Sequence, residues 1–249
     1  MDLNFNWEFN VLNIENFNIE TKLSMYFNFI KENDLIANGD IIECGVFNGR
    51  SIIATAMLLK KIGSEKKVYG YDSFGGFPPV YHAKDELSYF EKLIDDKAIT
   101  KKHFDAVKRN IELRSLSIDD LNVKNISSSG DFSNCSLDFL QRKLDFLELD
   151  NVVLVKGDFK DTMKKDKGPK KIFAALIDCD LYSSYHNSFE FIWPRLNKGG
   201  LCFLDEYYSL KFPGARAATN EFLSDKSFRL VMQNPPEEDE FERWAVIKK

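Results

Sequence analysis

The chain has 249 residues, of which 44% are hydrophobic and 14% aromatic, and its formal charge is -5 from 34 basic and 39 acidic side chains. This is enough apolar material for one large core, so we expect residues 1–249 to form a single domain. Neither charge sign forms a long block, which argues against a nucleic-acid partner. No signal peptide and no membrane-spanning run is recognisable, and the scattered cysteines lack a CxxC pair, so we expect a cytoplasmic protein.

The predicted elements alternate between strands and helices along most of the chain. An N-terminal helical segment covers residues 1–38, with helical spacing of apolar side chains from residue 21 onward. The expected strands are 40–47, 67–74, 151–159, 172–182, 201–208 and 243–249, and the expected helices are 50–63, 136–149, 184–197 and 214–225, with a KGG turn at 198–200. Strands that are almost continuously apolar and alternate with helices predict an α/β fold, with a mostly parallel sheet covered on both faces.

Residues 80–131 interrupt this alternation with a long polar stretch. Helix-like pieces occur at 86–96 and 100–111, and a segment rich in Ser, Gly and Asn follows them. The stretch is too short and too charged to form a core of its own. We therefore expect a helical lid that covers the strand ends and contacts the acceptor, rather than a second domain.

Acidic residues stand at the carboxyl ends of five successive predicted strands. They are Glu43, Asp72, Asp158, Asp178 with Asp180, and Asp205 with Glu206. Parallel sheets bind ligands outside these ends, where the strand order reverses. A packed core does not require such a series of acids, so we expect a binding site there.

The segment IIECGVFNGR combines Glu43 with two glycines, Gly45 and Gly49, at a strand-to-helix turn. Glycines let the backbone approach a ligand, and an acid at the end of the next strand, Asp72, suits ribose hydroxyls. A dinucleotide fingerprint has Gly where Glu43 stands, whereas the ammonium and sulfonium of S-adenosylmethionine favour a carboxylate there. The alternative is an ordinary turn in which the acid complements a helix dipole.

Asp178, Asp205 and Glu206 end two neighbouring strands. Carboxylates brought together in this way repel one another unless a hard cation lies between them, and oxygen ligands suit Mg²⁺. The alternative is that one or two of these acids are solvated loop residues.

Six motifs in one order resemble those of the metal-dependent sugar O-methyltransferases of the macrocin O-methyltransferase (TylF) type. They are GDIIECGVFNGRS, VYGYDSFGGFPP, VVLVKGDFKDTM, ALIDCDLYSS, PRLNKGGLCFLDEYY and FPGARAATNEFL, and they cover most of residues 39–223 apart from 80–131. The resemblance implies a class I methyltransferase fold with a seven-stranded Rossmann-like sheet. It also implies S-adenosylmethionine as the methyl donor, Mg²⁺ or another divalent ion, and a sugar or glycosylated small molecule as the acceptor.

By position, the resemblance also assigns roles to individual residues. The metal ligands would be Asp178, Asp205 and Glu206, and the general base would be Asp180. The cofactor residues would be Glu43, Gly45, Phe47, Gly49, Ser51, Asp72, Ser73, Asp158, Phe159 and Asp178, with Asp158 near the adenine. A metal that binds two neighbouring acceptor oxygens lowers the pKa of the hydroxyl, and Asp180 can then take its proton.

The chain departs from the family pattern in three places. Glu206 stands where a second Asp is usual, and Leu181 stands where plant and catechol-type relatives have a Lys, which excludes an amine base at that position. The stretch from Tyr81 to Asp131 is longer than the family pattern, so acceptor identity is the least constrained inference.

Other candidates have both a functional and a structural interpretation. His186 could assist as a catalytic base or begin a helix, and Tyr207 and Tyr208 could line the acceptor site or pack. We expect Cys179 to be a packing residue and His82 and His103 to be surface residues.

Three functions remain open from sequence: the O-methyltransferase, a nicotinamide-dependent oxidoreductase on a similar sheet, and a module that binds S-adenosylmethionine without catalysis. The N-terminal segment could pack over the active site or form a homo-oligomer contact.

Overall fold

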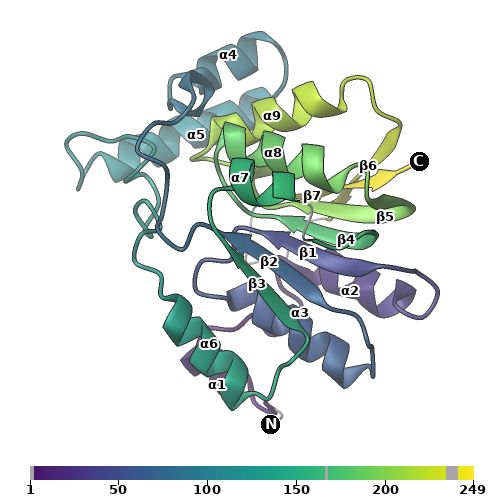
Figure 1. Ribbon diagram of the computed structural model, residues 1–249. Coiled ribbons are helices and arrows are strands. Elements are labelled where there is room, and N and C mark those ends of the chain that lie inside the picture. Colours follow the sequence, from purple (N-terminus) through teal and green to yellow (C-terminus); the bar gives the residue numbers. More distant parts are fainter. Residues whose placement is uncertain (1–2, 166–167, 234–240) are drawn as a thin grey trace.

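The structure is a computed structural model that describes residues 3–165, 168–233 and 241–249. A seven-stranded sheet of order β3-β2-β1-β4-β5-β7-β6 lies at its centre (Figure 1). The strands are β1 (Asp40–Cys44), β2 (Val68–Asp72), β3 (Val152–Lys156), β4 (Ile172–Ile177), β5 (Leu196–Leu204), β6 (Phe228–Gln233) and β7 (Arg243–Lys248). The first five strands run parallel, and β7 runs antiparallel to both β5 and β6. The expected mostly parallel α/β sheet is confirmed.

Helices cover both faces of the sheet (Figure 1). They are α1 (Asn6–Leu12), α2 (Ser24–Asn33), α3 (Arg50–Lys61), α4 (Tyr89–Asp95), α5 (Lys101–Arg114), α6 (Leu137–Phe146), α7 (Phe159–Thr162), α8 (Tyr182–Ile192) and α9 (Pro213–Leu223), with 3-10 turns η1 (Ala83–Asp85), η2 (Met163–Lys165) and η3 (Asp205–Tyr207). One hydrophobic cluster joins α1, α2, α3 and α6 to one face, and a second joins α8 and α9 to the other. Every residue of β4 is buried, as expected for a central parallel strand.

Element boundaries differ from expectation at a few places. Helix α8 ends at Ile192, before Pro194, and not at residue 197. The expected KGG turn is part of β5, but the ladder between β4 and β5 passes from Leu196 directly to Leu201, so these residues bulge out of the pairing. Strand β6 was not predicted, and none of its side chains is buried because it lies at the edge of the sheet. Helix α1 lies within the expected N-terminal helical segment 1–38, but before residue 21, where helical spacing begins.

Residues 80–131, here called the lid insertion, contain η1, α4 and α5, and the two helices expected in this stretch are confirmed. Phe90 and Val107 of the insertion pack against Ala217 of α9. Val123 and Ile126 pack against Leu181 and Phe212, which follow β4 and precede α9. The insertion therefore shares its hydrophobic contacts with elements that follow β4 and β5.

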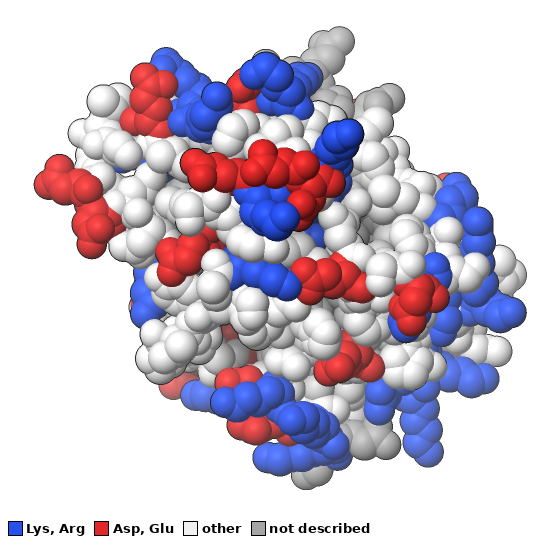
Figure 2. Space-filling view, turned by 90° about the horizontal axis from the view of Figure 1, so that it is seen from above, with Lys and Arg blue, Asp and Glu red and all other residues white. Residues whose placement is uncertain are grey.

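On the face seen in Figure 2, acidic and basic side chains lie side by side, without one large field of a single sign. Within the described ranges, no helix has both the length and the apolar character needed to cross a membrane.

Candidate functional site

The carboxyl ends of the central strands meet at one edge of the sheet. Cys44 of β1 is in register with Tyr71 of β2 and with Ile177 of β4, and Ile177 is in register with Leu204 of β5. Strand order reverses between β1 and β4, and a cavity of about 780 Å³ opens at this point. Asp72 and Asp178 both line it, so acids from distant parts of the sequence share one cavity.

Gly45 shapes the turn that follows β1. Its φ is 91°, and a Cβ at this position would lie 1.8 Å from the carbonyl oxygen of Asp178. The neighbouring backbone is tightly bonded, because Asp178 N donates to Cys44 O at 2.8 Å and Gly45 N donates to Tyr71 O at 2.9 Å. Only glycine permits this close approach of the β1 and β4 ends.

Asp72 holds the same turn from the end of β2. Its Oδ2 accepts hydrogen bonds from Val46 N at 2.7 Å and Phe47 N at 2.8 Å, and its Oδ1 accepts from Phe74 N at 2.7 Å. A carboxylate offers about four acceptor sites. Backbone N–H groups therefore occupy three of these sites, and about one is left for a ligand.

Glu43 lies beneath the turn and does not line the cavity. Ile42 and Cys44 face the cluster on the α8 side, so Glu43 between them points toward α3, where Ser51 Oγ donates to its Oε1 at 2.7 Å. Its Oε2 is buried without a hydrogen-bond partner among the described residues. Burial raises the pKa of Glu43 well above its ordinary value. Ser51 does line the cavity, so Glu43 is linked to the cavity through this hydroxyl.

Most of the residues expected at the cofactor do line the cavity: Gly45, Phe47, Ser51, Asp72, Ser73, Asp158, Phe159 and Asp178. Gly49 does not, and the expectation that it approaches the ligand is not met by this geometry. It precedes α3 with φ 82°, and a Cβ there would lie 2.3 Å from the Cδ1 atom of Leu140 in α6. Gly49 thus permits contact between two helices.

Asp158 and Phe159 line the cavity after β3, at the start of α7. Asp158 is the N-cap residue, and its Oδ1 accepts from Lys160 N at 3.0 Å. The Phe159 side chain is buried next to it.

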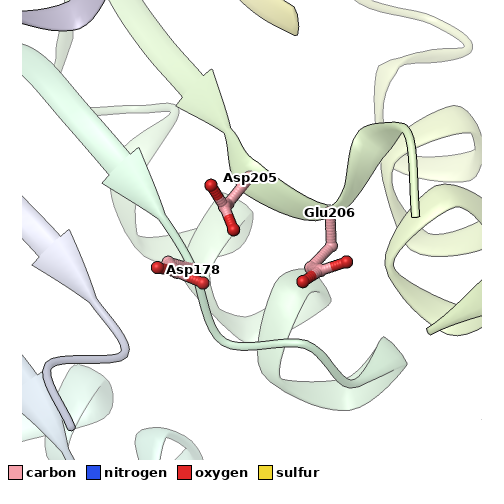
Figure 3. A group of neighbouring side chains, drawn as sticks. All are labelled: Asp178, Asp205 and Glu206. Atoms are coloured by element: carbon pink, nitrogen blue, oxygen red, sulfur yellow. The ribbon is translucent and has the colours of Figure 1, made fainter. Parts of the chain in front are cut away.

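Asp178, Asp205 and Glu206 form an acid triad. Figure 3 shows their carboxylates facing one another from the ends of β4 and β5, and one oxygen from each lies within 4.8 Å of the others. Three carboxylate oxygens at this spacing fit a hard divalent cation such as Mg²⁺. The Glu206 carboxylate therefore lies close to those of Asp178 and Asp205, although an Asp is usual at its position in the family.

Burial and mutual repulsion shift the pKa values of these acids. Burial, and then the charge of Asp205, raise the pKa of Asp178 to about 8. Burial also raises the pKa of Glu206. The same effect on Asp205 is outweighed by Lys22 and Arg243, which hold its pKa below the ordinary value. Burial therefore opposes ionisation of Asp178 and Glu206, whereas the two cations favour the ionised form of Asp205.

Asp180 lines the cavity beside the triad and is almost fully buried. Burial, followed by the charges of Glu206 and Asp178, raises its pKa well above the ordinary value. Its φ is 60°, a left-handed conformation that is uncommon for a residue other than glycine. Strained backbone of this kind is often found at functional sites.

His186 lies outside the cavity, and its expected catalytic role is not supported by this position. Helix α8 presents Ser183, Ser184 and Asn187 to the cavity. His186 instead points toward α9, with its ring centroid 6.2 Å from that of Phe222 and its Nδ1 3.8 Å from Glu190 Oε2. The phase of the helix, set by packing against α9, decides which side chains face the cavity.

Four other residues can now be assigned from their contacts. His103 was expected at the surface but is buried, with its ring stacked on Tyr208 at 4.0 Å between centroids. Tyr207 and Tyr208 do not line the cavity and serve packing. Cys179 is buried, and burial raises its thiol pKa well above the ordinary value, in keeping with a packing residue.

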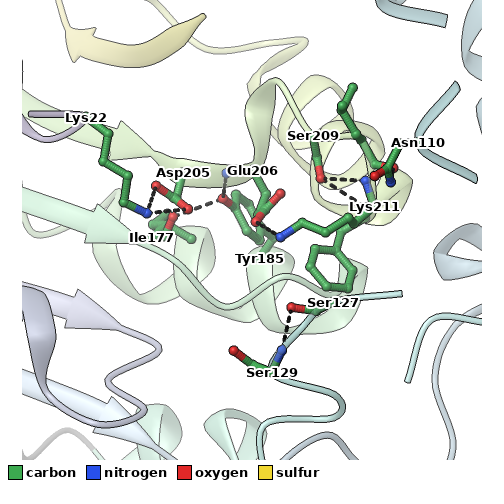
Figure 4. Close-up of polar contacts among 12 residues, drawn as sticks. Lys22, Asn110, Ser127, Ser129, Ile177, Tyr185, Asp205, Glu206, Ser209 and Lys211 are labelled. Atoms are coloured by element: carbon green, nitrogen blue, oxygen red, sulfur yellow. Dashed lines mark hydrogen bonds and ion pairs between the residues drawn. The ribbon is translucent and has the colours of Figure 1, made fainter. Parts of the chain in front are cut away.

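Two lysines that sequence reasoning missed flank the triad from opposite sides (Figure 4). Lys22 Nζ lies 3.1 Å and 3.3 Å from the two carboxylate oxygens of Asp205, and Lys211 Nζ lies 4.0 Å from Glu206 Oε1. Lys22 belongs to no motif, and it is 183 residues away from its partner. Lys211 directly precedes the FPGARAATNEFL motif and could have been suspected from that proximity.

The lid insertion is attached to both loops that carry the acids. After β4, Asp85 Oδ1 accepts from Tyr182 N at 2.7 Å. After β5, Nε2 of His103 bonds to Ser209 O at 2.7 Å and Asn110 Nδ2 donates to Leu210 O at 3.0 Å.

The strand order and the cavity at the β1–β4 switch point define the class I methyltransferase fold. The model of the macrocin O-methyltransferase (TylF) family matches residues 22–127 and 134–234, and the chain belongs to this family.

Similar proteins include the Streptomyces olivaceus 8-demethyl-8-(2,3-dimethoxy-alpha-L-rhamnosyl)-tetracenomycin-C 4'-O-methyltransferase, which is 27% identical over 171 residues, or 68% of this chain. The aligned region spans only 53% of that relative.

Solved structures share the fold. The O-methyltransferase NovP matches with a TM-score of 0.62 at 17% identity, over 97% of this chain and 80% of its own. The calicheamicin methyltransferase CalS11 matches with a TM-score of 0.59 at 22% identity, over 91% and 77%. An O-methyltransferase from Bacillus cereus, solved in complex with SAH, matches with a TM-score of 0.50 at 12% identity, over 97% and 88%.

Proposed function

We propose that this protein is an S-adenosylmethionine- and Mg²⁺-dependent O-methyltransferase that acts on a hydroxyl of a sugar or glycosylated small molecule. One observation carries the proposal: a single cavity of about 780 Å³ joins the turn at Gly45 and Asp72 to the acid triad and Asp180. A methyl transfer needs its donor and acceptor held side by side in this manner.

The cofactor side would be formed by Gly45, Asp72, Ser51 and the pair Asp158 and Phe159. S-adenosylmethionine would supply an electrophilic methyl group there. The residues fit the molecule, because Asp72 lines the cavity with about one acceptor site left for a ribose hydroxyl and a volume of this size accommodates a nucleoside. Ser51 would be oriented by Glu43.

The metal side would be formed by Asp178, Asp205 and Glu206. Mg²⁺ held by these oxygens would neutralise their charge, orient neighbouring acceptor oxygens and lower the pKa of a hydroxyl. The carboxylate of Asp180 would then accept the hydroxyl proton. Its position suits this role, because Asp180 lines the same cavity directly beside the triad.

The acceptor side would include an aromatic wall made of Phe47, Phe77 and Phe132. These residues line the cavity, and the ring centroid of Phe132 lies 5.3 Å from that of Phe47 and 5.2 Å from that of Phe77. Aromatic faces suit the apolar side of a sugar ring. Sugar specificity is also supported by the Streptomyces olivaceus relative, which is a 4'-O-methyltransferase of a rhamnosyl-tetracenomycin.

The test combines ligand binding with turnover. We expect SAH to raise the melting temperature and NADH to leave it unchanged, since the turn carries Glu43 instead of the dinucleotide glycine. Methyl transfer to a panel of nucleotide sugars and glycosides should require Mg²⁺ and stop in excess EDTA. Asp178→Ala should abolish turnover while SAH still binds, and Asp225→Ala, at an exposed site, should keep both.

Each alternative outcome has a clear meaning. Stabilisation by NADH but not SAH would indicate the oxidoreductase. SAH binding without turnover on any acceptor would favour a non-catalytic binding module. Full activity in EDTA would remove the metal from the mechanism.

A further inference from the structure

The contact between Lys22 and Asp205 places a positive charge at the edge of the acid triad. Nζ of Lys22 reaches both oxygens of Asp205, at 3.1 Å and 3.3 Å, and the Asp205 side chain is only 10% exposed. The ammonium therefore engages the same carboxylate that the triad offers to a cation (Figure 4).

The backbone that carries Lys22 is held in place. Leu23 is buried, Thr21 N donates to Ser24 Oγ at 2.7 Å, and Met25 N donates to Gln233 Oε1 of β6 at 2.7 Å. Lys22 can therefore leave Asp205 by rotating its long side chain, without moving the chain around it. The Lys22 side chain is 35% exposed and lines the cavity, so it has space into which it can turn.

A divalent ion and an ammonium cannot share Asp205 without strong repulsion, because both would lie within a few ångströms of the same oxygens in a partly buried site. We propose that Lys22 is a positioning residue that competes with the divalent cation for Asp205, holding this acid when no metal is bound and moving into the cavity when the metal enters. This inference rests on the proposed metal site. It adds a residue from the N-terminal segment whose charge lowers the affinity of that site.

The test is the affinity for Mn²⁺ alone, measured from the electron paramagnetic resonance signal of the free ion. Lys22→Met should bind Mn²⁺ about tenfold more tightly than the wild type, because it removes a positive charge from beside the ligands. Lys22→Arg should retain weak binding. Lys211→Met should give a smaller gain, since its contact with Glu206 is 4.0 Å long. Lys101→Met, at a site 82% exposed on α5, removes the same net charge and should change nothing.

A second measurement uses the wild-type protein and does not depend on the folding of a variant. Acetylation of Lys22, followed by mass spectrometry, should increase when Mn²⁺ is added, while Lys101 reacts equally in both conditions.

The outcomes separate this inference from the proposed function. Wild-type binding of Mn²⁺ with no gain in Lys22→Met, or unchanged Lys22 labelling, would refute the competition and leave the metal site standing. An absence of Mn²⁺ binding in every variant would overturn both.

Discussion

Asp85 of the lid insertion and Tyr182 at the start of α8 are 97 residues apart in the chain, yet Asp85 Oδ1 accepts a hydrogen bond from Tyr182 N at 2.7 Å. The other oxygen, Oδ2, accepts from His82 N at 3.1 Å. The His82 ring stacks on Tyr182 at 4.3 Å between centroids. This buried carboxyl thus fixes the lid insertion to the loop that begins with Asp178 and Asp180.

The Asp85 carboxyl should make stability fall as pH rises. Burial raises its pKa from 3.8 to about 6, so between these values the folded protein keeps a proton that the unfolded chain releases. The stabilisation is complete below pH 3.8 and is lost as pH rises through about 6, by about 3 kcal/mol in total. We expect the stability difference between the wild type and Asp85→Asn to change by this amount between pH 3 and pH 7 in urea titrations. Parallel stability curves would contradict the assignment.

Gly45 and Gly63 provide a matched pair of glycine substitutions. Both have positive φ, but a Cβ on Gly63 meets nothing within 4 Å, whereas on Gly45 it meets Asp178 O at 1.8 Å. Gly63→Ala should cost about 1 kcal/mol from backbone strain alone. Gly45→Ala should cost about 3 kcal/mol or more and weaken SAH binding, because the β1 and β4 ends must separate. Equal losses in chemical denaturation would show that the close approach is unimportant.

Removing the Asp72 carboxylate should damage the cofactor turn more than removing that of Asp158. Asp72→Ala leaves three backbone N–H groups without their acceptor, and we expect a loss of about 3 kcal/mol together with weaker SAH binding by calorimetry. Asp158→Ala removes one N-cap bond and should cost about 1 kcal/mol. If the two variants lose the same stability, the proposed bracing of the turn is wrong.

Asp180, before α8, and His186, within α8, are the two candidate bases, and substitutions can distinguish them. Asp180→Asn should lower kcat by about 10²–10⁴-fold, because the amide cannot accept the hydroxyl proton. His186→Ala should keep kcat within about twofold, because its ring lies outside the cavity and it is a partly exposed residue. A large loss of kcat in His186→Ala with normal folding would restore the catalytic role that the sequence suggested.

The convergence of the acids was predictable from the sequence because parallel strands in one sheet end at the same edge. Asp72, Asp178 and Asp205 each follow an apolar strand, and the topology alone brings them to one cavity. The fold class followed from the same alternation of elements. Strand β6 escaped prediction because an edge strand with exposed side chains has no strong apolar pattern.

The direction of individual side chains was less predictable. Glu43 and Gly49 lie in the right turn, but strand alternation and the packing of α6 turn them away from the cavity. Lys22 reaches Asp205 only through the tertiary placement of the N-terminal segment, which no local spacing encodes.

The lid insertion is attached to both acid-bearing loops. We expect this attachment to link acceptor selectivity to reaction rate, two properties that enzymes often vary independently. A substitution that moves this insertion will also pull on the backbone next to Asp180 and Glu206, through Tyr182 and Ser209. Transplanting the segment alone into a relative should therefore alter reaction rate along with selectivity, and a productive chimera would need to exchange the insertion and both loops as one unit.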